Sequence, residues 1–403
     1  MPQPSAICIA IDRLHVGMLG AYGNSWIHTP ALDRLASESL LLDQAIIDSP
    51  DLRLLYRSYW QGHHASVPDA SIDAPPLPQL LREQGLHTAL ITDDPQVADH
   101  PLSAGFGERL VVEEKISKTS TDTSLERLFA RAAQWLEQQD GAFFCWIHSR
   151  GLAGAWDAPL ELRNQYADPE DPIPPDIRQP PSRRLSEDAD PDELLGIVHA
   201  YAGQVTLLDS CIGALLELVG EHPLAKEALV IFFSARGYPL GEHGRLGPID
   251  DALYSELVHV PMLLRLPDRA AALTRAPQLV QPADLFATLS NWHQVEGPRS
   301  PAAWSLLPLA EGDNTAARQV AFAIAQHERA LRTGAWHARL TKHEDREQLE
   351  LFVKPDDRWE ANEVASHCVD AAESARTLLD ELGVAFDASN PPPLVDVLTN
   401  QAE

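Results

Sequence analysis

Short apolar runs alternate with amphipathic segments along most of the chain. The run at 5–11 (Ser-Ala-Ile-Cys-Ile-Ala-Ile) ends at Asp12, and similar runs follow at 86–92, 141–147 and 228–233. Runs of this length without polar alternation are typical of buried parallel strands. Apolar residues at helical spacing separate these runs. Strands that alternate with helices predict an α/β fold with a doubly wound, mostly parallel sheet.

Two of the predicted helices begin at residues with capping chemistry. Thr29 precedes Pro30, which predicts a helix with a threonine N-cap and a proline in its first turn. Thr123 and Glu126 have the spacing of a capping box, in which each side chain binds a backbone N–H of the other residue. Both patterns place a helix directly after a polar start signal.

The character of the chain changes after about residue 295. Residues 167–191 are rich in proline and acidic side chains and predict an exposed loop. Beyond 295 the segments are shorter and mixed, and a closing helix at 371–382 should end at Gly383. We therefore predict a large N-terminal α/β domain over 1–295 and a small C-terminal α+β subdomain over 296–403.

The chain is strongly acidic, with 31 basic and 59 acidic side chains and a formal net charge of −28. Such a surface repels phosphate backbones and anionic lipids, so we expect neither nucleic acid nor membranes as partners. No uninterrupted apolar run approaches the roughly 18 residues that a membrane helix needs. The charge also disfavours capture of anionic esters, unless a local positive pocket offsets it.

The cysteines and the first residues indicate a compartment. Cys8, Cys145, Cys211 and Cys368 are scattered along the chain, which fits free thiols better than a disulfide framework. Met1-Pro-Gln-Pro-Ser-Ala leads into the first strand without a basic region or a cleavage site. We expect a cytoplasmic protein, because free thiols persist in a reducing environment.

Ligands of open α/β sheets bind at the carboxyl ends of the strands, so the segments found there indicate function. Residues 12–24 (Asp-Arg-Leu-His-Val-Gly-Met-Leu-Gly-Ala-Tyr-Gly-Asn) and 29–36 (Thr-Pro-Ala-Leu-Asp-Arg-Leu-Ala) form one long motif. Further motifs lie at 202–213, 240–244 (Leu-Gly-Glu-His-Gly) and 351–365. Together they resemble the sulfatase family of the alkaline-phosphatase-like superfamily over nearly the full length. The resemblance implies the alkaline-phosphatase-like α/β fold.

The resemblance also implies a calcium site, at which four side chains supply oxygen ligands. The corresponding positions here are Asp12, Arg13, Ala235 and Arg236. A hard divalent cation needs several oxygen ligands, and only Asp12 supplies one. We therefore predict that the chain binds no metal and carries no cofactor.

The family nucleophile is a cysteine or serine that is oxidised to formylglycine. This chain keeps Ser49 and Pro50 of that motif, but Leu52 stands at the nucleophile position. The motif arginine aligns with Tyr56, and Arg57 lies one residue beyond. Leucine cannot form an aldehyde hydrate, which excludes covalent catalysis by this route at Leu52.

The remaining catalytic positions of the family are also changed. Its lysine and histidine after the second strand align with Asp93 and Pro95, and a later lysine aligns with Pro248. Framework residues between these positions are kept. We therefore predict a pseudo-sulfatase with no catalytic residues, which binds a ligand or partner without turnover.

Two other functions stay open. One is an active hydrolase of sulfate or phosphate esters, with a site rebuilt from the remaining acids and histidines. The other is a structural partner of an active paralogue, which predicts a large apolar surface patch. An anionic or sugar-like small ligand and a protein are the partners that we consider. Residues 148–159, together with Trp146 and Trp156, either line a cleft for a sugar-like ligand or pack as an ordinary loop.

The pocket candidates come from the strand ends and the family motifs; they are Asp12, Arg13, Arg57, Asp93, Arg236 and His243. Three arrangements of the two arginines at the former metal position are open. They pair with Asp12 as an internal salt bridge, they turn to the surface, or they form an anion pocket without metal. Glu242-His243 either supports its loop or joins a rebuilt site.

Overall fold

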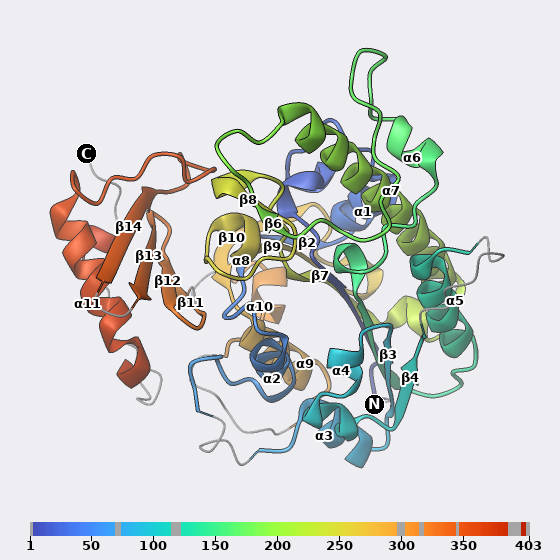
Figure 1. Ribbon diagram of the computed structural model, residues 1–403. Coiled ribbons are helices and arrows are strands. Elements are labelled where there is room, and N and C mark those ends of the chain that lie inside the picture. The colour runs from blue at the N-terminus through green and yellow to red at the C-terminus, as the bar shows by residue number, and fades with distance from the viewer. Residues whose placement is uncertain are drawn as a thin grey trace. The chain divides into compact units, whose positions relative to one another are not determined.

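The computed structural model describes residues 3–68, 74–113, 122–295, 303–313, 318–343, 346–385 and 396–399 (Figure 1). Its contacts define two compact units, each assembled from separate stretches of the chain. The first unit comprises Met1–Leu41, Pro78–Ile249 and Pro261–Arg275, and the second comprises Leu42–Leu77, Asp250–Val260 and Ala276–Glu403. The predicted division at 295/296 along the chain stays a prediction, and residue 296 lies outside the described residues.

The main sheet has eight strands in the order β10-β2-β9-β7-β1-β5-β3-β4. Their bounds, in chain order, are β1 Ala6–Asp12, β2 Leu40–Ile46, β3 His87–Thr92, β4 Glu108–Val111, β5 Phe143–Ser149, β7 Leu229–Arg236, β9 His259–Arg265 and β10 Thr274–Val280. Strand β1 pairs in parallel with β5 and β7, and β3 pairs in parallel with β4 and β5. Strand β9 is antiparallel to β7. The sheet is thus mixed but mostly parallel, and the predicted α/β class is confirmed.

The apolar runs explain which strands the sequence revealed. Strands β1 and β5 are buried at every position, as expected of central strands between two helical layers. The predicted runs match β1, β3, β5 and β7 within a few residues. Strand β4 (Glu-Arg-Leu-Val) is mostly exposed at the edge of the sheet, and β2 contains Asp43 and Gln44. Neither strand has the apolar run on which the prediction depended.

Helix α7, Pro191–Glu221, is the longest described helix of the first unit, and it packs against α1, Pro30–Ser37, and α5, Ser124–Glu137 (Figure 1). The capping box of α5 is confirmed, because Glu126 N donates to Thr123 Oγ1 and Thr123 N donates to Glu126 Oε2. By length and composition, α7 alone among the described helices is long and apolar enough to cross a membrane, but 61% of its most apolar window is buried within the protein. The core helices of soluble proteins often have this length and apolar composition, so α7 is weak evidence for a membrane span.

The start of α1 differs from the prediction. Thr29 occupies the N-cap position, but its side chain makes no capping hydrogen bond. The carboxylate of Asp209 on α7 accepts from the backbone N–H groups of Ala31, at 3.1 Å, and Leu32, at 2.8 Å. A residue 177 positions away from Leu32 therefore satisfies the helix terminus.

The predicted exposed loop at 167–191 is confirmed in the main, although Arg183–Arg184 within it form the short strand β6, which pairs with β8, Arg245–Leu246, and Pro191 already begins α7. One further prediction needs correction. The closing helix α11 spans Val369–Ala385 and runs through Gly383, so the predicted stop at that residue is wrong. Glycine weakens a helix interior without preventing it when packing holds the flanking turns.

The second unit contains a four-stranded antiparallel sheet in the order β11-β12-β13-β14. Its strands are β11 Ala321–Ile324, β12 Glu328–Arg332, β13 Trp336–His343 and β14 Arg346–Val353. Helix α11 packs on this sheet, and their apolar residues form one core cluster (Figure 1). Elsewhere in the same unit, α2, Leu52–Gln61, contacts α9, Pro282–Trp292.

Candidate functional site

The candidate site lies in the first unit, where β1 and β7 end side by side. Asp12 is the last residue of β1, and its register partner on β7 is Arg236. Arg236 Nε donates to Asp12 Oδ1 at 2.9 Å, and Arg236 Nη2 donates to Asp12 Oδ2 at 2.6 Å. This is a bidentate ion pair, in which the Asp12 side chain is 1% exposed and the Arg236 side chain 12%. Of the arrangements open to Arg236, the structure contains the internal salt bridge.

The charges at this pair favour the ionised carboxylate. Burial by itself opposes ionisation, but the charge and hydrogen bonds of Arg236 and the charge of Arg13 hold the pKa of Asp12 below its usual value. Asp12 is therefore a carboxylate matched by a fixed cation of the same chain. Both of its oxygen atoms accept hydrogen bonds from that cation.

Arg13 is also buried, with only 1% of the residue exposed. Its Nη1 donates to the carbonyl of Gly237 at 3.4 Å, and its own carbonyl accepts from the Tyr201 hydroxyl at 2.8 Å. Its φ of 65° is uncommon for a residue with a side chain, and the surrounding contacts hold it there. The arrangement in which Arg13 turns to the surface is therefore wrong.

The third family ligand position, Ala235, is fully buried and offers no ligand atom beyond its backbone. Next to it, Ser234 Oγ lies 2.7 Å from the carbonyl of Ile11 and accepts from Leu14 N at 3.1 Å, which joins β7 to the segment after β1. The four positions thus present one carboxylate that is engaged by a guanidinium, a second guanidinium and a methyl group. These residues do not fit a divalent cation.

Asp93 and Asp94 follow β3, which is separated from β1 by β5 in the sheet. Asp93 Oδ1 accepts from the N–H of Arg150 at 2.7 Å, and desolvation raises the pKa of Asp93 to about 6. Asp94 is the N-cap of α4, Pro95–Ala98, and accepts from the N–H of Gln96. Pro95, at the family's histidine position, therefore begins a short helix and brings no imidazole.

His148 is a site residue that the sequence analysis did not select. Its Nε2 lies 3.5 Å from Asp94 Oδ2, and its charge helps to lower the pKa of Asp94 against the effect of burial. The histidine is fully buried near the end of β5 and is the register partner of Thr92 on β3. A polar residue near the end of an apolar run was the available signal. Among the described residues, no group of three or more His, Cys, Asp or Glu side chains is placed to hold a metal ion.

The Leu-Gly-Glu-His-Gly segment contacts the residues after β1. Glu242 Oε2 accepts from the N–H of Leu240 at 2.5 Å, and Glu242 Oε1 lies 3.4 Å from His15 Nε2. The neighbouring His243 has a φ of 50°, and its carbonyl accepts from Arg245 Nη1 at 2.8 Å. Pro248 follows β8 and supplies no amine in place of the family lysine. These contacts give Glu242 a role in loop support.

The tryptophans near the β5 end are internal. Trp146 and Trp156 are both fully buried. Trp156 Nε1 donates to the carbonyl of Leu152 at 2.9 Å, and its ring packs beside those of Tyr201 and Tyr238. Neither indole is available to stack on a sugar at the surface.

The segment that aligns with the family's nucleophile motif belongs to the second unit. Leu52 is the first residue of α2, and only 5% of it is exposed. The side chain of Asp51 caps this helix by accepting from the N–H of Arg53 at 2.8 Å. Leu52 is thus an apolar core residue at a helix start.

Arg57, the pocket candidate on α2, binds backbone carbonyls of the turn that follows the helix. Its Nη2 donates to the carbonyls of His64, at 3.1 Å, and Ala65, at 2.9 Å. A buried guanidinium that binds two consecutive carbonyls fixes the turn after the helix. The pocket candidates therefore separate into Asp12, Arg13, Asp93, Arg236 and His243 in the first unit and Arg57 in the second.

The eight-stranded sheet and the residues at its strand ends define an alkaline-phosphatase-like fold. Two solved structures resemble this chain over almost its whole length. The phosphonate monoester hydrolase of Agrobacterium radiobacter has a TM-score of 0.74 at 18% identity, with 96% of this chain and 95% of that chain covered. BT4656, in complex with its substrate D-glucosamine-2-N,6-O-disulfate, has a TM-score of 0.76 at 16% identity, with coverages of 96% and 98%. At these identities the likeness shows the fold alone.

Sequence comparison supplies the family. The sulfatase family model matches residues 4–295, so the chain belongs to the sulfatase family. Iduronate 2-sulfatase of Homo sapiens is 25% identical over 352 residues, which cover 69% of this chain and 62% of the relative. The Mus musculus protein of the same name is 24% identical over 361 residues, with coverages of 71% and 64%. The chain thus spans less than two thirds of the length of these relatives, and the family resemblance seen in the motifs is confirmed.

Proposed function

We propose that this chain is a catalytically inactive member of the sulfatase family, a pseudo-sulfatase that binds a ligand or protein partner without turnover. The observation that carries the proposal is the bidentate pair between Asp12 and Arg236. A metal ligand must direct oxygen lone pairs at the ion. Here both carboxylate oxygens accept hydrogen bonds from a guanidinium instead.

The repulsion between a bound divalent cation and the arginines can be estimated from Coulomb's law. A divalent cation bound to Asp12 would lie beside the guanidinium of Arg236, with Arg13 also close enough to influence that carboxylate. A +2 and a +1 charge at about 4 Å repel by roughly 8 kcal/mol at an effective dielectric constant of about 20. Binding would also break two charge-assisted hydrogen bonds. No second carboxylate at the other family positions offsets these terms.

The former nucleophile position supports the same proposal. Leu52 is an aliphatic core residue that can neither be oxidised to an aldehyde nor attack a sulfur or phosphorus centre. The charge of −28 and four cysteines that form no disulfide support a cytoplasmic role without nucleic acid or membrane partners. Cell fractionation tests that part of the proposal.

A second candidate function is an active ester hydrolase with a rebuilt site. It is favoured by Asp93, whose pKa of about 6 suits proton transfer near neutral pH, and by the Asp94–His148 contact beside it. Asp93 accepts a hydrogen bond from the loop backbone, which agrees equally with a structural role. The two candidates differ in one measurable property, turnover.

Metal content and turnover, measured together, decide between them. We expect no stoichiometric Ca, Mg, Mn or Zn by elemental mass spectrometry, and no hydrolysis of p-nitrophenyl sulfate or p-nitrophenyl phosphate. The matched variants are Asp12→Asn for the ion-pair site and Asp93→Asn for the alternative site. Metal near one per chain with chelator-sensitive turnover that Asp12→Asn abolishes would overturn the proposal. Turnover lost only in Asp93→Asn would establish the second candidate.

A further inference from the structure

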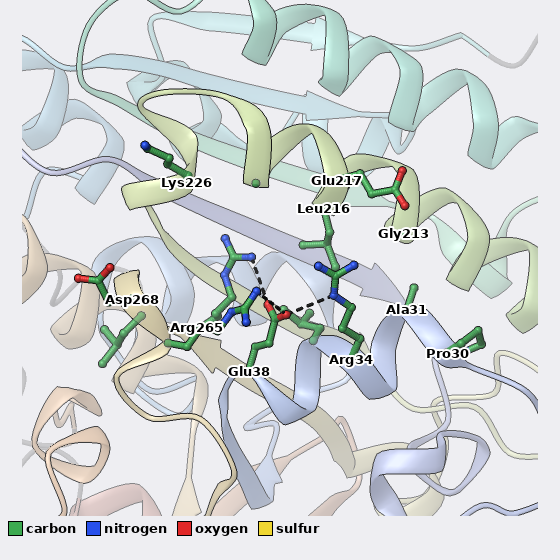
Figure 2. A pocket seen from close by; sticks show the side chains of 14 residues that line it. Pro30, Ala31, Arg34, Glu38, Gly213, Leu216, Glu217, Lys226, Arg265 and Asp268 are labelled. Carbon is green, nitrogen blue, oxygen red and sulfur yellow. Dashed lines mark hydrogen bonds and ion pairs between the residues drawn. The ribbon is translucent and has the colours of Figure 1, made fainter.

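The first unit contains a pocket of about 570 Å³ that is remote from the site described above (Figure 2). The pocket is lined by residues of α1 and its C-cap Glu38, of α7 and the 3-10 turn Ala225–Glu227 after it, and of the end of β9 and the loop that follows. Arg265, in its wall, is the register partner of Val230 near the start of β7, whereas Arg236 ends the same strand. Six residues of extended strand span about 20 Å. The pocket therefore lies at the opposite end of β7 from the Asp12–Arg236 pair.

Three arginines in the pocket wall converge on one carboxylate, that of Glu38 (Figure 2). Arg34 Nε lies 3.2 Å and Arg269 Nη2 3.0 Å from Glu38 Oε1, and Arg265 Nη1 lies 3.9 Å from Glu38 Oε2. One negative charge thus meets three fixed positive charges. Lys226 adds a fourth cation to the lining. The cluster keeps an excess of positive charge on a protein whose net charge is −28.

Burial strengthens the repulsion among these positive charges. Only 9% of Arg265 is exposed, and the Glu38 side chain is 12% exposed. Burial, together with the charges of Arg269 and Arg34, lowers the pKa of Arg265 despite the opposing effect of Glu38. Like charges held close together in a partly desolvated wall are unfavourable unless an anion joins them. The Arg34 and Arg269 side chains, 66% and 59% exposed, stay accessible to such an anion.

The other acidic residues of the lining do not neutralise the cluster. Glu217 and Asp268 also line the pocket. In Figure 2 they lie on either side of the arginines, and the interactions drawn converge on Glu38.

Asp268 and Arg269 have φ values of 54° and 55°, a conformation that is strained for residues with side chains. The loop after β9 holds this strain while it directs Arg269 to Glu38.

We propose that this pocket binds a small molecule through a phosphate or sulfate ester group. Each guanidinium has five N–H donors, and the contacts with Glu38 leave donors on all three arginines for a tetrahedral dianion. A volume of about 570 Å³ lies within the range of about 300–1,000 Å³ that is usual for small-molecule sites and leaves room for an uncharged body beside the anionic group. The inference goes beyond the proposed function and holds whether or not the strand-end site is active.

Calorimetric titration of the full chain tests this site. The probes are inorganic phosphate, inorganic sulfate, glucose 6-phosphate and glucose 6-sulfate, each at low ionic strength. We expect the sugar esters to bind more tightly than the free anions, because the pocket also accommodates the sugar. Esters that bind no better than the free anions would refute an ester ligand, and no binding by any probe would refute the anion site.

Charge variants locate the binding. Arg269→Gln and Arg34→Gln each remove one donor group, so the Kd for the ester should rise about tenfold. Glu38→Gln removes the competing carboxylate, so the Kd should fall by about the same factor. Arg376→Gln neutralises an exposed arginine elsewhere and should leave the Kd unchanged.

Arg236→Met separates this proposal from the proposed function. Binding that Arg236→Met abolishes and that Arg269→Gln leaves intact would place the anion at the former metal site and overturn the inference. Melting temperatures of all variants establish that each is folded. Arg34→Gln is the most conservative test, because its side chain is the most exposed of the three arginines.

Discussion

Removal of the Arg236 guanidinium is the most direct test of how the Asp12–Arg236 site is held together. The variant Arg236→Met keeps the aliphatic part of the side chain and leaves Asp12 as a buried carboxylate without its bidentate partner. Opposite unit charges about 4 Å apart attract by roughly 4 kcal/mol at an effective dielectric constant of about 20. Loss of one partner of a buried ion pair usually destabilises a protein by about 3–5 kcal/mol. We therefore expect a loss of about 4 kcal/mol.

Thermal unfolding followed by circular dichroism provides the assay. A loss of about 4 kcal/mol corresponds to a fall in Tm of roughly 8–16 °C for a unit of this size. The double variant Asp12→Asn/Arg236→Gln replaces the ion pair by two neutral amides, so it should recover more than half of the loss. Arg376→Gln removes an exposed ion pair with Glu347 and should change stability by no more than about 1 kcal/mol.

Two results would refute this reasoning. A change below about 1 kcal/mol in Arg236→Met would mean that the pair behaves like an exposed surface ion pair. A double variant as unstable as Arg236→Met would show that the loss comes from packing of the arginine stem, and that an unpaired buried charge has no part in it. Addition of calcium and of a chelator should leave the Tm of the unmodified protein unchanged.

Three further predictions concern the framework. Burial raises the pKa of Asp48 to about 7, so the folded state holds the proton more tightly than the unfolded chain does. The contribution of Asp48 to stability is therefore full below about pH 4 and is lost as the pH rises through 7. Asp48→Asn should flatten that part of the stability–pH curve, measured by urea unfolding. Asp209→Ala removes the carboxylate that caps α1 and should cost about 1–2 kcal/mol in the same assay, and an unchanged midpoint would contradict its capping role. Leu52→Ala should lower stability by about 2–4 kcal/mol, whereas Leu52→Cys should leave aryl-sulfate turnover at the background level; measurable turnover by Leu52→Cys would show that the rest of the site is intact.

Sequence patterns predicted the elements whose signals are local. The apolar run before Asp12 became β1, and the Thr123–Glu126 capping box begins α5 as expected. Such signals need only neighbouring residues, because burial on both faces and the orphan N–H groups of a helix start are local properties. The motifs at the strand ends likewise indicated the sulfatase family, and the match to the family model confirms it.

Contacts between distant residues were not predictable in the same way. The sequence left open whether Arg13 and Arg236 pair with Asp12, turn to the surface or form an anion pocket, because the outcome depends on the register of β1 with β7. The cap of α1 comes from Asp209, which no local pattern connects with that helix. His148 escaped notice because its partner, Asp94, follows a different strand. Each of these contacts exists only once the sheet is assembled.

The ion pair between Asp12 and Arg236 has a consequence for the evolution of this chain. A metal site is open to small steps, because a weakened ligand set still binds some ion and water satisfies the remainder. An ion pair between two side chains has no comparably stable intermediate, because a substitution at either residue alone leaves the other charge buried without a partner. A lineage with this pair would gain metal binding there only through a less stable protein or by two substitutions together. The Asp12–Arg236 pair therefore opposes the stepwise gain of a metal site at this position.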